Sequence, residues 1–402
     1  MAGSTLAGAT FIGYMVGGGR AYGYDAAVTM ENFVTRSTGE VFTRQAAFNN
    51  HPLLSLVEHV VWSVTGSADE ATMRLAPALF AAAAVGLLTW RVATHWGLTA
   101  GVVGGAVLAA HPMLTSERDV RGYTLAVLTV VAIGVAVFDA RSPALFAVAL
   151  AIGVGTHFYV AVAGACLVGV LWRRGELTRV WRLSAAFGFV AGFACYAGMV
   201  DQVGRNRGVR VFRPRFPVDA AWEALGGNVV AVVALLALIV VAARPRPSST
   251  AVFVSAGLAL GVVGPWLLAP TDLYPRFIFF AAPAVAVAAS AGVRRQPRVA
   301  VLGVVAAAAM LVPSLGRWTR DDVPNRQLAS AAVGRVCGVG FTIEALEWYE
   351  PGIIASSDCP TAEILLPTAI PEDTAVARDT WPALCWSVDG GELRGRTSAD
   401  CP

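Results

Sequence analysis

Three short polar clusters stand out in a chain whose other stretches are mostly long and apolar. They are Asp25, the segment Asn49-Asn50-His51-Pro52-Leu53, and the segment Arg118-Asp119-Val120-Arg121-Gly122-Tyr123. A carboxylate can accept the proton of an attacking hydroxyl group, and paired arginines can hold an anionic leaving group. Ions are costly at bilayer depth and are retained where they meet water, a partner or a substrate. The clusters therefore predict a polar site on one face of a membrane protein.

The composition supports the membrane assignment. Hydrophobic residues make up 56% of the 402 residues, charged residues make up 14%, and the mean hydropathy is +0.61. Charge-free runs of roughly 15–20 residues, the length that crosses a bilayer, predict about eleven spans. They lie near 5–19, 74–92, 98–114, 122–138, 143–156, 158–172, 183–200, 224–243, 249–269, 277–293 and 299–316. The predicted fold class is therefore an all-α polytopic membrane domain.

The first run is short and has no basic region before it, so we expect a span truncated at its start, not a cleaved signal peptide. Orientation needs a second argument, because arginines are shared almost equally between the two sets of loops and the chain has no lysine. Four cysteines follow the last span, at positions 337, 359, 385 and 401. They predict two disulfides, with the connectivity open, and an oxidising compartment. We therefore expect this tail, and Asp25 with it, to be extracytoplasmic.

The chain divides into a membrane domain, residues 1–316, and a small α/β domain, residues 317–402. We expect the second domain to be extracytoplasmic and disulfide-bonded. Within it, the pattern predicts a helix over Gln327–Val336 and a short strand over Glu363–Leu366. Cys166 and Cys195 fall inside spans, where packing thiols are expected.

The first external loop, residues 20–73, is long enough to have structure of its own. From Leu53 onward its apolar residues recur with the spacing of one helical face, while Ser55, Glu58 and His59 fall largely opposite. This pattern predicts an amphipathic helix over 53–65 that lies at the membrane surface.

Short motifs at the ends of the predicted spans follow one another in a recognisable order. The first are Gly23-Tyr24-Asp25-Ala26-Ala27, His51-Pro52-Leu53 and Arg74-Leu75-Ala76-Pro77. The later ones are Ser116-Glu117-Arg118-Asp119-Val120-Arg121-Gly122-Tyr123, Thr156-His157-Phe158-Tyr159 and Tyr274-Pro275-Arg276-Phe277. This order resembles that of the GT-C glycosyltransferases, most closely the branch with protein O-mannosyltransferases and the lipid A aminoarabinose transferase. The likeness covers most of residues 20–295.

The resemblance implies a glycosyltransferase that moves a sugar from a polyprenyl-phosphate donor to an acceptor on the outer face of the membrane. The residues matched to donor-phosphate binding are Arg118, Arg121, His157, Tyr159 and Arg276. Candidate contacts to the rest of the substrate, not all of them in these motifs, are Glu31, His51, Glu58, His59, Tyr123 and Tyr274. The family often has Asp-Glu where this chain has Asp25-Ala26, so a second acid would have to come from Glu31 or elsewhere.

The chemistry of an inverting transfer leads to the same residues. Asp25 is the natural base for the acceptor hydroxyl, and a nearby arginine would keep it ionised. Arg118 and Arg121 are three residues apart at a helical start and can converge on phosphate oxygens. Structural alternatives stay open: Asp25 could cap a helix, the arginines could be interfacial anchors, and His51 and His157 could serve turns.

The sequence does not decide whether the protein uses a metal cofactor. Asp25, His51, Glu58 and His59 are of metal-ligating types but lack tight ligand spacing, so a divalent metal is neither predicted nor excluded. Alternating arginines within 205–215 predict a basic strip that would attract anionic lipid headgroups or the carrier phosphate.

Two other functional classes compete with the transferase: a transporter or flippase of lipid-linked sugars, and a noncatalytic membrane scaffold. A transporter would show internal repeats and broken helices, which the sequence does not reveal. The lysine-free, Ala/Val/Gly/Arg-rich composition is typical of a high-GC bacterium, which associates the donor with arabinose or mannose. The acceptor would be an envelope glycan, lipid or protein, the location the plasma membrane, and no nucleic-acid partner is predicted.

Overall fold

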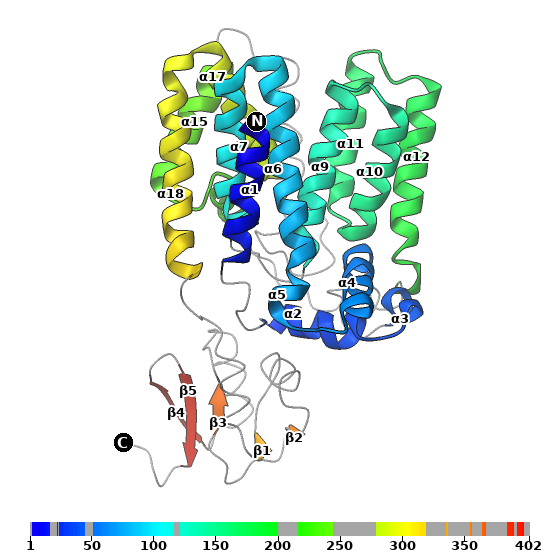
Figure 1. Ribbon diagram of the computed structural model, residues 1–402, viewed down its shortest axis with the longest axis vertical. Coiled ribbons are helices and arrows are strands. Elements are labelled where there is room, and N and C mark those ends of the chain that lie inside the picture. Colours follow the sequence, from blue (N-terminus) through cyan, green and yellow to red (C-terminus); the bar gives the residue numbers. More distant parts are fainter. Residues whose placement is uncertain are drawn as a thin grey trace.

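The computed structural model describes most of the membrane domain and short pieces of the tail. The described residues are 2–16, 22, 24–44, 51–115, 121–199, 216–243, 279–318 and five strands between 335 and 397. The helices of the membrane domain stand side by side as a bundle, with the short helices of the first external loop gathered at one end (Figure 1).

The bundle consists of two groups of helices that meet where α6 packs against α9. The first group is α1 (Ala2–Met15), α6 (Leu75–Trp96), α7 (Leu98–Ala110), α15 (Val229–Ala243), α17 (Ala281–Arg295) and α18 (Ala300–Trp318). The second group is α9 (Tyr123–Phe138), α10 (Pro143–Thr156), α11 (Val160–Arg173) and α12 (Arg179–Ala194). Among the described residues, the continuous run Glu70–Trp96 is long and apolar enough to cross a membrane by itself.

Small residues allow α10 and α12 to approach closely. A Cβ atom added at Gly188 would lie 2.9 Å from Leu150 Cβ, and one added at Gly192 would lie 2.5 Å from Val154 Cβ. Lipid tails are as apolar as leucine, so close backbone packing has to hold such helices together in a bilayer. This contact fixes the position of the α10–α11 turn, which carries His157.

Two predicted spans are broken in the structure. Within the span predicted over 98–114, the helix α7 already ends at Ala110, and a separate short helix, α8 (Pro112–Thr115), follows. The span predicted over 224–243 starts late, because α14 (Phe216–Ala224) meets α15 at an angle of 78°. Hydropathy does not detect breaks in a continuous apolar run, although Pro112 and the glycine pair at 226–227 mark them.

Side chains brace the bend between α14 and α15. The Nε2 atom of His111 lies 3.0 Å from the carbonyl oxygen of Ala224, the last residue of α14. Asn228 donates from Nδ2 to the carbonyl of Ala309 at 2.7 Å, and its Oδ1 accepts the N–H of Ala231 at 3.1 Å. The bend is therefore anchored to both α7 and α18.

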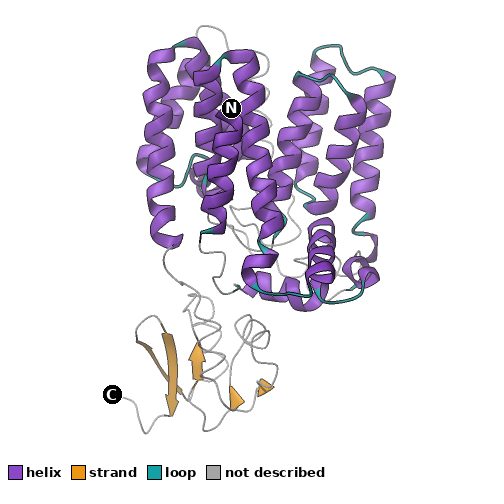
Figure 2. Cartoon of the chain, in the orientation of Figure 1, coloured by secondary structure: helices purple, strands orange, loops and turns teal. Residues whose placement is uncertain are grey.

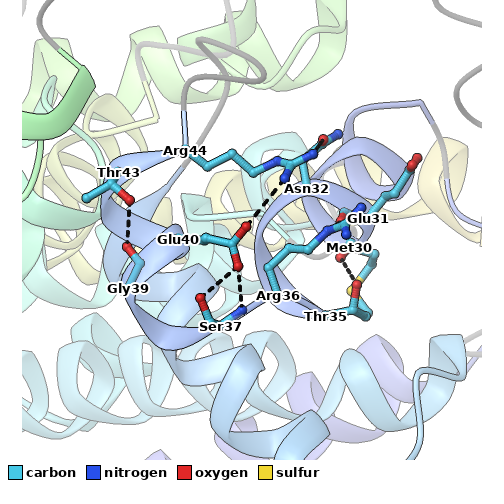
Figure 3. Close-up of polar contacts among 10 residues, drawn as sticks. All are labelled: Met30, Glu31, Asn32, Thr35, Arg36, Ser37, Gly39, Glu40, Thr43 and Arg44. Atoms are coloured by element: carbon cyan, nitrogen blue, oxygen red, sulfur yellow. Dashed lines mark hydrogen bonds and ion pairs between the residues drawn. The ribbon is translucent and has the colours of Figure 1, made fainter.

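The loop over residues 20–73, predicted to be external, contains short helices. They are α2 (Tyr24–Thr29), the π-helix η1 (Met30–Val34), α3 (Thr38–Thr43), α4 (Pro52–Thr65) and α5 (Glu70–Met73). Figure 3 shows the polar contacts that tie η1 to α3. Arg44 donates to Asn32 Oδ1 at 3.2 Å and to Glu40 at 3.5 Å, and Ser37 and Glu40 form a capping box at the start of α3. Arg44 therefore fixes the π-helix that directly follows the helix of Asp25.

The helix α4 has an unusual distribution of polarity. Ser55 and Glu58 are fully buried, whereas Val60 is 52% and Val64 is 80% exposed. On a soluble protein the apolar face of a helix turns inward. Leu54 is buried with Ser55 and Glu58, so the buried side of α4 is mixed, and the outward-facing valines are compatible with the predicted position of α4 at the membrane surface.

Asp69 caps α5, and its replacement by alanine is expected to lower stability by about 1 kcal/mol, whereas asparagine should be nearly neutral. Its carboxylate accepts the Thr72 N–H at 2.9 Å. Hydrogen bonds from Ser67 and Thr72 lower the pKa of Asp69 from 3.8 to about 2. The stabilisation is therefore present above pH 3.8 and is lost as the pH falls through 2. Thermal unfolding in detergent measures the effect, and equal melting temperatures for the alanine variant and the parent would contradict it.

The described part of the tail contains only strands, drawn in orange in Figure 2. β1 (Arg335–Val336) pairs in parallel with β2 (Ile354–Ala355), and β5 (Glu392–Thr397) lies between β3 (Ile364–Leu366) and β4 (Leu384–Asp389) in an antiparallel sheet. The strand predicted over 363–366 corresponds to β3. The helix predicted over 327–336 is wrong at its end, because pairing with β2 makes 335–336 a strand.

The tail cysteines at 337, 359 and 401 lie outside the described residues, so the two disulfides remain a prediction. Within the described part, Cys166 and Cys195 are free, as expected for packing thiols in spans.

Candidate functional site

Four segments that are distant in the sequence bring aromatic and basic side chains together at the loop-helix end of the bundle. His51 precedes α4, Tyr123 begins α9, His157 lies between α10 and α11, and Phe279 precedes α17. The ring of His157 lies 5.1 Å from His51, 5.5 Å from Tyr123 and 4.7 Å from Phe279, measured between centroids. All four side chains are buried. The motifs at 51–53, 121–123 and 156–159 therefore converge in one cluster.

The two histidines present different nitrogen atoms to this cluster. Nδ1 of His51 lies 3.1 Å from the carbonyl oxygen of Thr156, and because a carbonyl only accepts, Nδ1 carries a proton. Nδ1 of His157 instead accepts the backbone N–H of Tyr159 at 3.4 Å, which leaves the proton of a neutral ring on Nε2. His51 makes no capping bond to α4. Its ring instead bridges α4 to the end of α10.

Arg121 supplies the positive charge of the cluster. Its side chain is 2% exposed, and its guanidinium carbon lies 5.3 Å from the centroid of the Tyr123 ring. The residue stands two positions before α9, whose first-turn N–H groups and helix dipole also favour an anion. A buried guanidinium near a helix N-terminus is suited to a phosphate group, and the rings of His51 and His157 contact the same tyrosine.

Tyr159 completes the polar turn after α10. Its ring is buried, and its centroid lies 5.7 Å from that of His157. Thr156 Oγ1, on the same turn, has no hydrogen-bond partner among the described residues. The turn therefore brings three polar side chains to the cluster.

Gly122 makes the close approach of these segments possible, and Gly122→Ala is expected to reduce activity at least tenfold. An added Cβ would lie 2.9 Å from Cγ of His51 and 2.9 Å from Cγ2 of Thr156, so the histidine ring would have to move. A misplacement of about 1 Å in an active site can cost 10²-fold. Gly134→Ala is the matched control, because nothing lies within 4 Å of a Cβ there, in the same helix. Equal activity of the two variants would contradict the prediction.

A second buried polar group lies beside the helix of Asp25. The guanidinium carbon of Arg74 is 5.5 Å from the centroid of Tyr22, and the hydroxyl of Tyr22 donates to the carbonyl of Ala68 at 3.0 Å. Tyr22 packs with Met73 and with residues of α2 and η1 in a small core of their own. This core attaches α2 to the start of α6. Asp25 is in the first turn of α2, past the capping position, and its side chain lies outside the described part.

Sequence reasoning missed Glu70 and cited Arg74 only within a motif, yet both side chains are buried. The available indication was two ionisable residues at or just before the start of the apolar run 74–92, where a charge is kept only for a reason. Glu58 was predicted, and it is fully buried on the face of α4 that also carries Ser55.

Two predicted substrate-binding residues, His59 and Glu31, make their contacts outside the cluster around His157. His59 contacts the carbonyl of Val34 through Nδ1 at 2.8 Å and the hydroxyl of Thr38 through Nε2 at 3.1 Å, which links α4 to the preceding segments. Glu31 is half-buried in η1, and its backbone carbonyl accepts from Arg36. Their roles stay predictions. Arg118, Tyr274 and Arg276 lie outside the described residues, as does the strip at 205–215.

Metal ligands do not gather in the described part of the chain, where no three His, Cys, Asp or Glu side chains come together in a group that could hold an ion. The site described so far is an anion-binding arrangement of Arg121, two histidines and a helix N-terminus, next to a loop that carries several carboxylates.

Comparison with known proteins identifies the fold. No family model and no curated protein matches the chain. A crystal structure of ArnT from Cupriavidus metallidurans bound to undecaprenyl phosphate is similar, with a TM-score of 0.60 and 14% identity over 99% of this chain and 98% of that one. ArnT in the apo state gives a TM-score of 0.56 at 14% identity, covering 97% of each chain. The chain thus has the fold of ArnT, which confirms at the level of the fold the resemblance that the sequence motifs indicated.

Proposed function

We propose that this protein is an inverting glycosyltransferase that transfers a sugar from a polyprenyl-phosphate donor to an acceptor on the outer face of the bacterial plasma membrane. One observation carries the proposal: His51, Arg121, Tyr123 and His157 reach one buried cluster from three chain segments. The supporting comparison is the shared fold with ArnT, whose crystal structure holds undecaprenyl phosphate.

In the proposed reaction the donor phosphate binds at this cluster. Arg121 and the Nε2–H of His157 donate to its oxygens, and the N-terminus of α9 adds a favourable dipole. The leaving group is a phosphate that stays anionic, so it needs neutralisation more than protonation. Arg118 and Arg276 are proposed to add charge from the neighbouring positions of their motifs.

The transfer itself exchanges one bond for another. The acceptor hydroxyl oxygen forms a bond to the anomeric carbon of the sugar, while the bond from that carbon to the phosphate oxygen breaks and its electron pair leaves with polyprenyl phosphate. Asp25 takes the hydroxyl proton as general base. The helix α2, which carries Asp25, is held beside Arg74 through Tyr22. The positive charge of Arg74 favours the ionised form of a nearby carboxylate.

The sugar is proposed to be arabinose or mannose, and the acceptor an envelope glycan, lipid or protein. A flippase for lipid-linked sugars is the second candidate, because the 78° break between α14 and α15 is a broken helix of the kind that transporters use. The sequence alone had not revealed this break.

One experiment separates the two functions. Purified protein in liposomes is given polyprenyl-phosphate mannose or arabinose and a mixture of envelope acceptors. Two quantities are measured: the release of polyprenyl phosphate, and the leaflet of the bilayer in which the intact donor lies. The transferase releases polyprenyl phosphate only when acceptor is present. Movement of intact donor across the bilayer without release would favour the flippase, and inertness toward both donors would reject the proposed sugars.

A further inference from the structure

The end of the bundle opposite the candidate site is strongly basic. We call the helix ends within residues 90–98, 138–142, 172–182 and 294–299 the basic end; they lie at the top of Figure 1. These residues include nine arginines and only two carboxylates, Asp139 and Glu176. The first external loop at the other end has the reverse balance, with three arginines and six acids within 22–44 and 51–75. Charge is therefore separated along the bundle axis in the described part.

Three of these arginines are stacked on aromatic rings. In two of the pairs the arginine and the ring belong to different helices. The guanidinium carbon of Arg174, at the end of α11, lies 5.1 Å from the ring centroid of Phe138 on α9. That of Arg294, in the last turn of α17, lies 5.6 Å from the ring centroid of Trp96 on α6. Arg91 lies 4.6 Å from the ring centroid of its neighbour Trp90. Stacking on an aromatic face holds the planar guanidinium in place at these helix ends.

One carboxylate of the basic end is already matched within the protein. Asp139 forms an ion pair with Arg91, and its Oδ1 lies 2.8 Å from Nε2 of His95. Most of the remaining arginines of this end, including Arg174 and Arg294, are exposed. The basic end therefore keeps an excess of positive charge that faces outward.

The surroundings favour lipid over other anionic partners. Large apolar side chains are exposed among the same helix ends, with Trp172 at 75%, Leu98 at 63% and Trp90 at 56%. Tryptophan and arginine at the ends of apolar helices are the residues that occupy the level of lipid headgroups. A soluble acidic protein or a nucleic acid would leave these apolar side chains in water.

We infer that the basic end binds the headgroups of anionic phospholipids, and that Arg174 and Arg294 with their aromatic partners are two of its contact points. The phosphodiester of a lipid such as phosphatidylglycerol lies at the depth of the exposed tryptophans and accepts from the guanidinium N–H groups. Electrostatic attraction to an anionic leaflet is worth about fivefold in affinity for each arginine near the surface. This surface is separate from the candidate site and does not rest on the proposed function.

Native mass spectrometry of the purified full-length protein, released from nanodiscs of equal parts phosphatidylglycerol and phosphatidylcholine, tests the inference. The parent is expected to retain phosphatidylglycerol in preference. The double variant Arg174→Gln, Arg294→Gln should lose most of that preference, and Glu176→Gln should increase it by removing a negative charge. Arg36→Gln at the opposite end is the matched control and should behave like the parent.

Three outcomes would overturn the inference: equal retention of both lipids by the parent, unchanged retention by the double variant, or an equal loss in Arg36→Gln. Circular dichroism and gel filtration show whether the double variant is folded. If it is not, the paired lysine variant, which keeps the charge but lacks the planar fork, gives the same comparison with a smaller expected loss.

Discussion

Asp25→Asn is expected to lower the rate of sugar transfer by a factor on the order of 10²–10⁴, the range for removal of a general base. Asparagine keeps the size and hydrogen bonding of the side chain but cannot take the proton of the acceptor hydroxyl. Binding of the lipid donor and the folded state should be retained, because α2 is held by Tyr22 and its small core. Single-turnover transfer with a saturating donor measures the loss.

A structural role for Asp25 makes the opposite prediction, because asparagine caps a helix about as well as aspartate. Asp69→Asn is the matched control, an external aspartate that does cap a helix. If Asp25→Asn transferred sugar as fast as this control, the base would have to be sought elsewhere, with Glu31 and Glu58 as the next candidates.

Arg121→Ala is expected to raise the KM for the donor by roughly 10–150-fold, since a hydrogen bond to a charged group contributes about 1.5–3 kcal/mol. The guanidinium is buried against Tyr123, whose ring in turn contacts His157. Arg121→Lys should restore only part of the affinity, because lysine lacks the bidentate fork. Arg118→Ala is expected to act in the same direction.

Binding of polyprenyl phosphate without a sugar separates recognition of the phosphate from chemistry. Arg121→Ala should weaken this binding as much as it raises KM, whereas Arg36→Ala, outside the cluster, should leave it unchanged. Parent-like binding by both Arg121→Ala and Arg118→Ala would reduce these residues to interfacial anchors.

The sequence was most informative where motifs fell at the ends of apolar runs. Each run reverses the direction of the chain, so His51, Arg121 and His157 are predicted to share one face. In the structure the rings of the two histidines stack, and Arg121 lies over Tyr123 of the same cluster. Their mutual geometry could not be predicted, because the side-chain and backbone contacts join residues such as His51 and Thr156 that are more than a hundred positions apart.

Other features depend on contacts between separate elements. The π-helix at 30–34 depends on a side-chain contact from Arg44, and the bend before α15 depends on His111 and Asn228 from separate elements. Hydropathy averages over such local breaks. Burial of Glu70 and Arg74 follows from the docking of the first external loop, which is a tertiary event that composition does not encode.

The reversed polarity of α4 has a consequence for how a substrate arrives. His51 and Glu58 are on its buried side, and Val60 and Val64 are on its exposed side. At the predicted membrane surface, a wall of one helix, about 10 Å thick, would separate the polar interior from the acyl chains. A donor that is itself a lipid would then never have to leave the bilayer. It would arrive by diffusion in two dimensions, and its mole fraction among the lipids, not its concentration in water, would set how often the site is filled.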